Sequence, residues 1–126
     1  MAHQLAPLRI LVVDDNHDAA DLIADFLEIH GHQAKPVYGG KEALQVAPVF
    51  APHVVLLDLG MPDVDGYAVA ADLKRRPELS DTLVVALTAW GDAATRERAH
   101  SAGFDRHLVK PASFDAILDV LAAPRR

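Results

Sequence analysis

Residues 8–16, LRILVVDDN, carry the pattern of strand, turn and helix start from which the fold of this chain is predicted. Its first six residues are mostly aliphatic and partly β-branched, which is typical of a short strand that is buried on both faces of a sheet. Asp14 and Asp15 end the run, and Asn16 is placed to cap a following helix that Gly31 should end in the left-handed conformation. The stripe of this helix that we expect to face the core consists of Ala19, Leu22, Ile23, Phe26, Leu27 and His30.

The same unit of strand followed by helix recurs along the rest of the chain. Further strands are predicted at 33–37, 54–57, 83–87 and 105–109. Further helices are predicted at about 41–47, after the loop 60–66, at about 92–102 and after the capping residue Ser113. The inward-facing residues of the third and the last helix are expected to be Val69, Ala70, Leu73, Phe114, Ile117, Leu118 and Leu121.

Two prolines add detail to this prediction. Pro48 should end the second helix, because proline has no backbone N–H and clashes with the preceding turn. Pro36 indicates that the strand 33–37 lies at an edge of the sheet, and the short, half-polar strand 105–109 is expected to form the other edge. The fold class is therefore α/β, with a doubly wound, five-stranded parallel sheet in the order 2-1-3-4-5 flanked by five helices.

The composition is that of one globular domain. The chain has 126 residues, of which 51% are hydrophobic and 24% charged, and it has no cysteine, which excludes disulfide scaffolds, zinc–thiolate clusters and thiol nucleophiles. The net charge of −6 argues against direct nucleic-acid binding. No apolar run is long enough for membrane insertion and no signal peptide is evident, so we expect a cytoplasmic protein. The domain should span residues 8–122, between an N-terminal arm (1–7) and a C-terminal tail (123–126).

Chemically distinctive side chains follow four of the predicted strands. Asp14 and Asp15 follow the first, Asp58 the third and Thr88 the fourth, and Lys110 follows the fifth. In a doubly wound sheet, ligands bind beyond the carboxyl ends of the strands, near the point where the strand order reverses. A single aspartate after a strand is more often only a helix cap, but five such residues converging on one edge indicate a site.

Three carboxylates in one place require a cation or shifted pKa values, since two unit charges at 4 Å repel by about 4 kcal/mol at an effective dielectric constant of 20. Lys110 can neutralise only part of this charge, and Mg²⁺ suits a site of oxygen ligands with few carboxylates. With Mg²⁺ bound, Asp58 at the end of a central strand is the natural acceptor of a phosphoryl group, giving an aspartyl phosphate. Thr88 could then donate a hydrogen bond to a phosphoryl oxygen.

These residues lie in four motifs: LVVDD at 11–15, LLDLGMPDVDG at 56–66, ALTAW at 86–90 and LVKPAS at 108–113. Together they resemble the receiver domain of bacterial two-component response regulators, over about residues 8–122. The resemblance implies a flavodoxin-like receiver fold and a phosphorelay in which Asp58 takes phosphate from a histidine kinase or a histidine phosphotransfer protein. It implies direct Mg²⁺ binding by Asp15, Asp58 and the carbonyl of Gly60, with Asp14 acting mainly through water.

The resemblance also implies Thr88 as the switch hydroxyl, Lys110 as the phosphate-binding cation and a cis Lys110–Pro111 bond. Three positions depart from the family pattern or vary within it. His107 stands where the family often has a switch tyrosine or phenylalanine, so it is either a titratable switch residue or an ordinary exposed strand residue. Gly60 and Trp90 stand where neighbouring side chains control the access of water to the acyl phosphate.

The resemblance places the switching surface on the fourth helix, the fifth strand and the fifth helix. The output is expected to be a downstream protein partner or a domain of a longer parent protein, and a homodimer is possible. The motif around His107 looks closest to receivers of hybrid histidine kinases or single-domain receivers. We expect a signalling domain that catalyses only its own phosphorylation and dephosphorylation, rather than an enzyme.

Three alternatives remain open at this stage. A phosphatase of the haloacid-dehalogenase type also forms an aspartyl phosphate, although it usually carries Asp-x-Asp after the first strand, where this chain has adjacent aspartates. A flavin carrier of the same fold would have to place the flavin phosphate among carboxylates. The third alternative is a docking module that is not phosphorylated and in which the site has no function.

Overall fold

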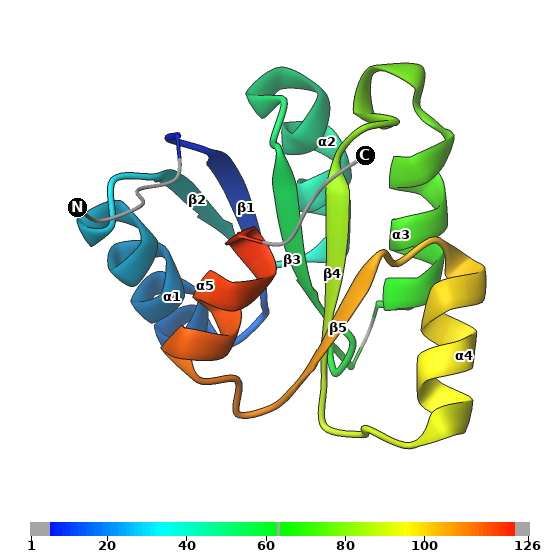
Figure 1. Ribbon diagram of the computed structural model, residues 1–126. Helices are drawn as coiled ribbons and strands as arrows, with labels where there is room; N and C mark the ends of the chain where they lie inside the picture. The colour runs from blue at the N-terminus through cyan, green and yellow to red at the C-terminus, as the bar shows by residue number, and fades with distance from the viewer. Residues whose placement is uncertain (1–5, 63, 123–126) are drawn as a thin grey trace.

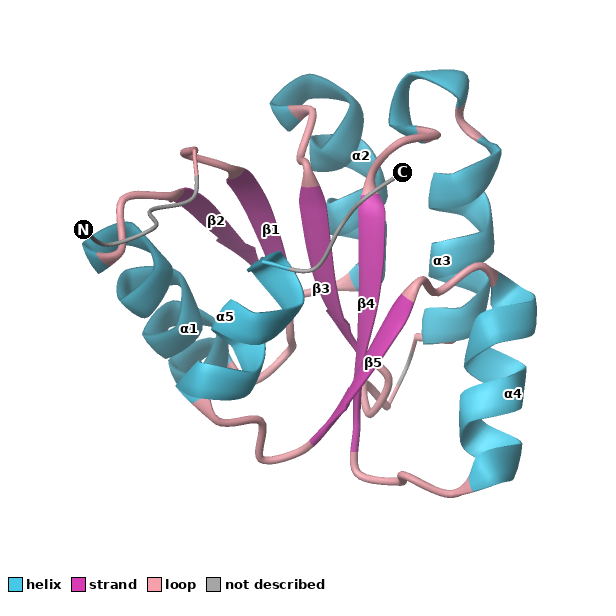
Figure 2. Ribbon diagram, viewed as in Figure 1, coloured by secondary structure: helices cyan, strands magenta, loops and turns pink. Residues whose placement is uncertain are grey.

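Five parallel strands form a single sheet in the order β2-β1-β3-β4-β5, which confirms the predicted topology. The structure is a computed structural model that describes residues 6–62 and 64–122. The elements, shown in Figures 1 and 2, are β1 (Arg9–Val13), α1 (His17–Ile29), β2 (Gln33–Val37), α2 (Gly40–Phe50), β3 (Val54–Asp58), α3 (Gly66–Arg75), a 3₁₀ turn (Pro77–Leu79), β4 (Leu83–Thr88), α4 (Ala93–Ala102), β5 (Arg106–Val109) and α5 (Phe114–Ala122). Most of the expected N-terminal arm and all of the C-terminal tail lie outside the described residues.

Helices cover both faces of the sheet, because each central strand is apolar on both sides. α1 and α5 pack on one face, where Ile10, Val12, Leu56 and Leu87 meet Leu27 and Ile117. α2, α3 and α4 cover the other face, with a core that includes Leu11, Leu57, Leu73, Ala99 and Phe104. Figure 1 shows this division, with α1 and α5 to one side of the sheet and α3 and α4 to the other. No helix in the described part of the chain is both long and apolar enough to span a bilayer.

The helix boundaries follow local signals in the sequence. The Ala19 N–H donates a hydrogen bond to Asn16 Oδ1 at 3.0 Å, and the Ala116 N–H donates to Ser113 Oγ at 3.0 Å, so both predicted caps are confirmed. Gly31 and Gly103 follow α1 and α4 with φ of +90° and +110°, the left-handed region that favours glycine.

The prediction that α2 ends near Pro48 is wrong. The helix continues through Pro48 to Phe50, and Ala51 closes it in a left-handed conformation, with its N–H donating to the Ala47 carbonyl at 2.8 Å. Proline removes only one N–H, and this loss is tolerated because Pro48 lies in the last turn of the helix.

The predicted inward stripe of α1 is partly wrong. The buried residues are Ala20, Ala24 and Leu27, whereas Leu22 is 59% exposed and His30 is exposed as well. These three residues define the face of α1 that packs on the sheet, and Leu22 lies on the opposite side of the helix. Phe114, predicted to point inward from α5, is also 37% exposed. Its ring stacks on that of Phe26, with centroids 4.0 Å apart, between α5 and α1.

We predict that Gly103→Ala destabilises the protein more than Gly31→Ala. Both substitutions place a side chain at positive φ, which costs about 1–2 kcal/mol. A Cβ at position 103 would also lie 2.9 Å from Lys74 Cγ, whereas no atom of the described residues lies within 4 Å of a Cβ at position 31. Urea unfolding of the two variants measures the difference, and equal losses of stability would contradict the crowding at Gly103.

Candidate functional site

The carboxyl ends of β1, β3, β4 and β5 bring together the polar residues that the sequence singles out. Asp58 is the last residue of β3 and is only 2% exposed, and Asp14 directly follows β1 and is 4% exposed. Asp15 is exposed beside them. Carboxylate oxygens of Asp14, Asp15 and Asp58 all lie within 4.8 Å of one another. The predicted acidic cluster is therefore present in the structure.

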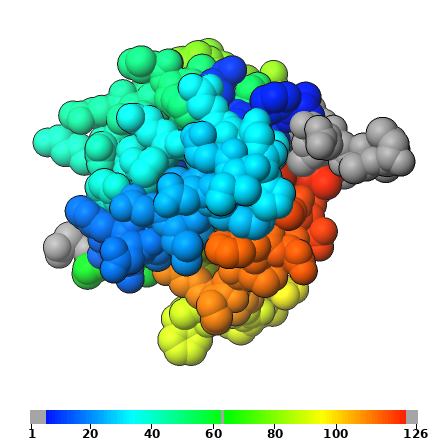
Figure 3. Space-filling view, turned by 90° about the vertical axis from the view of Figure 1, so that its left-hand side faces the viewer, coloured from blue at the N-terminus to red at the C-terminus, as the bar shows by residue number. Residues whose placement is uncertain are grey.

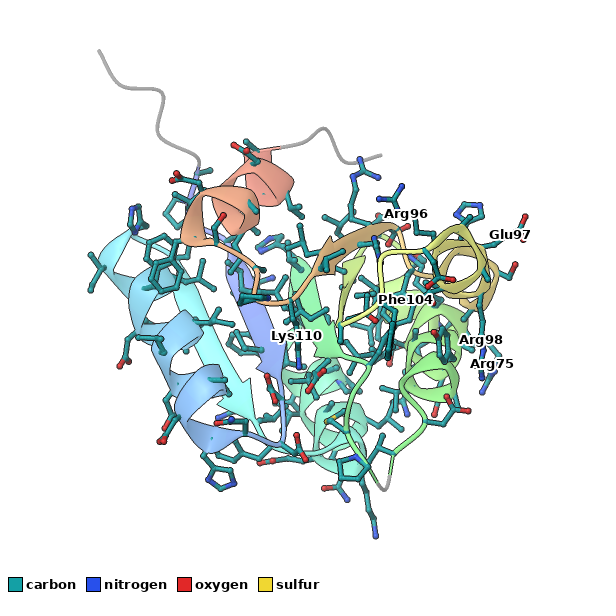
Figure 4. The ribbon with its side chains drawn as sticks, turned by 90° about the horizontal axis from the view of Figure 1, so that it is seen from below. Arg75, Arg96, Glu97, Arg98, Phe104 and Lys110 are labelled. Atoms are coloured by element: carbon teal, nitrogen blue, oxygen red, sulfur yellow. The ribbon has the colours of Figure 1, made fainter. Side chains whose placement is uncertain are left out.

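Lys110 supplies a positive charge to this cluster. Its Nζ lies 2.6 Å from Asp58 Oδ1, and the backbone N–H of Lys110 donates to the Thr88 carbonyl at 2.7 Å, which fixes the start of the loop after β5. The Lys110–Pro111 peptide bond is cis, as the resemblance implied. Figure 4, viewed toward this end of the sheet, shows Lys110 close to the ends of the central strands.

Gly60 completes the surroundings of Asp58. Its backbone N–H donates a hydrogen bond of 2.8 Å to Asp58 Oδ1. A Cβ at position 60 would lie 3.3 Å from that same oxygen and 4.0 Å from Lys110 Nζ. A Cβ at this position would therefore crowd the Asp58 carboxylate and contact the Lys110 ammonium group, and glycine keeps the space above the carboxylate open.

Thr88 and His107 both bond to the backbone of Trp90. The Trp90 N–H donates to Thr88 Oγ1 at 3.1 Å, and His107 Nε2 lies 3.3 Å from the Trp90 carbonyl oxygen, a contact that requires the proton on Nε2. Thr88 is buried, His107 is half-buried and the Trp90 side chain is 71% exposed. Trp90 is not among the residues that line the cavity at Asp58, whereas Gly60 is.

A groove of about 780 Å³ extends from the acidic cluster between the first half of α1 and residues 110–114, at the start of α5. Figure 3 shows that these two helices form one continuous face of the molecule. Apolar residues line the groove beside the charged end, and they include Leu22, Ile23, Ala112 and Phe114. Leu22 and Phe114, which the sequence pattern assigns to the core, line this groove instead. The signal was available, since Ala20, Ala24 and Leu27 already form a complete buried stripe at helical spacing.

Burial among like charges raises the pKa of Asp14 to about 6. Desolvation is the largest cause, and the neighbouring Asp58 carboxylate adds to it, while the Asn16 N–H, which donates to Asp14 Oδ1 at 3.0 Å, and Lys110 act in the opposite direction. Because of this raised pKa, the Asp14 carboxyl of the native state holds its proton between about pH 4 and pH 6, where the unfolded chain has already lost it. Ionised Asp14 therefore destabilises the fold at neutral pH.

These observations fit a divalent metal ion with oxygen ligands. Three carboxylates face one ammonium group, the donors are all oxygens, and one carboxyl has a pKa raised by its unfavourable surroundings. Hard cations such as Mg²⁺ prefer this kind of donor set.

We predict that Asp14→Asn stabilises the metal-free protein at pH 7, by about 1–3 kcal/mol from a pKa shift of roughly two units. The gain should shrink as the pH falls from 6 to 4, because wild-type Asp14 takes up its proton in that window. Thermal unfolding in EDTA over this pH range measures the effect. Asp15→Asn, at an exposed position, is the control and should change stability less. A loss of stability in Asp14→Asn at pH 7 would contradict the conclusion that ionised Asp14 destabilises the fold.

The sequence comparisons agree with this geometry. The family described as response regulator receiver domain matches residues 10–122. The chain is 32% identical to the DNA-binding dual master transcriptional regulator RpaA of Synechocystis sp. over 87% of its own length and 46% of the relative's. It is 30% identical to the polar-differentiation response regulator DivK of Brucella anthropi, over 91% and 94% of the two chains. It is 38% identical to the sensor histidine kinase RcsC of Salmonella typhi, over 91% of this chain and 12% of the kinase.

The structural comparison gives the same fold. The chemotaxis protein CheY4 of Vibrio cholerae matches with a TM-score of 0.87 at 23% identity, over 92% of this chain and 97% of the other. The chain spans less than half the length of transcriptional regulators such as RpaA, but nearly the full length of DivK. Since the family match covers almost the entire chain, the protein belongs to the response regulator receiver domain family.

Proposed function

We propose that this domain is the phosphoacceptor of a two-component phosphorelay and that Asp58 carries the phosphoryl group. The observation that carries the proposal is the placement of Asp58, a carboxylate at the end of the central strand β3, between Lys110 Nζ at 2.6 Å and the carboxylates of Asp14 and Asp15. A carboxylate needs such surroundings to accept a phosphoryl group, because the transferred group brings further negative charge.

Mg²⁺ is the proposed cofactor, held by Asp15, Asp58 and the carbonyl of Gly60, with Asp14 acting mainly through water. When bound, the ion neutralises negative charge on the acidic cluster and on the phosphoryl oxygens. Lys110 supplies the other positive charge. Gly60 leaves room for the incoming group, since even a Cβ there would approach Asp58 Oδ1 to 3.3 Å.

The proposed donor is a phosphohistidine on a histidine kinase or a histidine phosphotransfer protein. The phosphorus–nitrogen bond breaks as a phosphorus–oxygen bond to Asp58 forms, and the departing imidazole nitrogen keeps the electron pair and takes up a proton. The groove between α1 and α5 supports docking of such a partner, because the exposed side chains of Leu22 and Phe114 offer apolar contact next to Asp58.

The proposed signal is a shift between an inactive and an active population. The Thr88 hydroxyl accepts a hydrogen bond from the Trp90 N–H here, and we expect it to turn toward the phosphoryl group instead. That change would free the loop before α4 and move the surface formed by α4, β5 and α5. His107, whose Nε2 contacts the Trp90 carbonyl, is the proposed switch residue.

A downstream protein or another domain of a longer parent chain would read this surface. The domain acts as a stoichiometric acceptor that catalyses only its own phosphorylation and dephosphorylation. We place it in the cytoplasm on the basis of the family resemblance. Its net charge of −6 argues against direct binding to nucleic acid.

We predict that the protein incubated with Mg²⁺ and acetyl phosphate gains the mass of a single phosphoryl group, as measured by intact mass spectrometry. Asp58→Asn should gain none, because the amide cannot accept the group. The gain in mass should require Mg²⁺. After acetyl phosphate is removed, the added mass should disappear as the acyl phosphate hydrolyses.

Asp65→Asn is a matched control, because Asp65 also precedes a helix but caps α3, its Oδ1 accepting the Tyr67 N–H at 3.0 Å. This variant should still take up phosphate. Labelling of Asp58→Asn, or release of many phosphates per chain as in a phosphatase, would contradict the proposed function.

We also predict that Trp90→Ala shortens the lifetime of the phosphorylated form severalfold, because Trp90 stands two residues after Thr88, where the family resemblance implies that side chains limit the access of water to the acyl phosphate. Decay of the phosphorylated mass after removal of acetyl phosphate measures this lifetime. Trp90→Phe retains an aromatic ring and should decay more like wild type. An unaltered decay rate in Trp90→Ala would show that the Trp90 side chain does not limit the access of water to the acyl phosphate.

A further inference from the structure

Helix α4 has very little apolar surface with which to hold its place. Of its ten residues, all of which the structure describes, Ala99 alone is buried. The others are mostly small or charged, so burial of apolar area contributes little to the docking of this helix. A helix held so weakly depends on a few specific contacts for its position.

One such contact joins α4 to α3. The Arg98 guanidinium carbon lies 4.0 Å from the centroid of the Tyr67 ring, in a cation–π arrangement. The same ring meets Phe104 edge-on, with centroids 6.2 Å apart and an interplanar angle of 90°, and Phe104 is buried just after α4. Figure 4 shows Arg98 on the side of α4 near α3, while Arg96, two residues earlier, lies on the other side of the helix.

Tyr67 also lies close to the acceptor strand. It is the second residue of α3, and the first, Gly66, packs directly on the end of β3. A Cβ at position 66 would lie 2.7 Å from Leu59 Cδ2 and 3.5 Å from the Asp58 carbonyl oxygen. The start of α3 therefore rests on the backbone of the acceptor, and the Tyr67 ring extends from there to α4.

We propose that Arg98 is a positioning residue, whose contact with Tyr67 holds α4 in the arrangement seen here and opposes its displacement on phosphorylation. This inference rests on the proposed function, and it adds a restraint on α4 that does not pass through Thr88. An exposed cation–π pair is worth about 0.5–1 kcal/mol, which corresponds to a roughly two- to five-fold shift between two states.

Hydrogen–deuterium exchange of the α4 amides in the unmodified protein is the first test. Arg98→Met keeps the aliphatic stem but removes the charge, and it should speed exchange in α4 two- to five-fold without opening the core, because Arg98 is exposed. Tyr67→Phe keeps the ring and should behave as wild type. Arg96→Met, which removes an exposed charge from the other side of α4, is the matched control and should leave exchange unchanged.

The same measurement with Mg²⁺ and acetyl phosphate separates a switching role from a purely structural one. If phosphorylation breaks the contact, the change in α4 exchange on phosphorylation should be two- to five-fold smaller in Arg98→Met than in wild type. If Arg98→Met speeds α4 exchange equally in the unmodified and in the phosphorylated protein, the contact is only structural and the proposal is overturned. Exchange in Arg98→Met that equals wild type in both states would overturn it as well.

Intact mass spectrometry of the same samples distinguishes the failure of the two proposals. Absence of phosphate from the wild-type protein would overturn the proposed function and, with it, the coupling to phosphorylation. Normal phosphate uptake with unaltered α4 exchange in Arg98→Met would overturn only the role of Arg98.

Discussion

The crowding of carboxylates around Asp58 is the constraint on which the other features of this protein depend. Asp14 and Asp58 are almost fully buried, Asp15 lies beside them, and the ammonium group of Lys110 contacts Asp58. Repulsion between like charges at such distances amounts to several kcal/mol even at an effective dielectric constant of 20. Burial raises the pKa of Asp14, and repulsion from Asp58 adds to this effect.

The sheet holds this unfavourable arrangement in place. β1, β3 and β4 are buried and apolar on both faces, so their carboxyl ends have little freedom to separate. The stability that the two cores provide offsets the cost of the ionised site, a balance that is common at functional sites. By contrast, α4 has a single buried residue and can respond to small changes in the site.

Much of the fold could be predicted from the sequence because its signals are local. The aliphatic runs, the Asn16 and Ser113 caps, and the glycines after α1 and α4 all act within a few residues of their positions. The acidic cluster was also predictable, since parallel strands bring their carboxyl ends to one edge. The exposure of Leu22 was also predictable, although our interpretation missed it, since Ala20, Ala24 and Leu27 already form a buried stripe at helical spacing. The Arg98–Tyr67 contact was out of reach, as it joins two helices whose relative position no sequence pattern specifies.

A calorimetric titration of the protein with Mg²⁺ at pH 7 measures whether this acidic cluster binds a divalent cation. If the carboxylates need a doubly charged ion, wild type should bind one Mg²⁺ per chain at millimolar concentration or below, and Asp15→Asn should bind it more weakly. No heat of binding at millimolar Mg²⁺, or equal binding by the two proteins, would contradict the account.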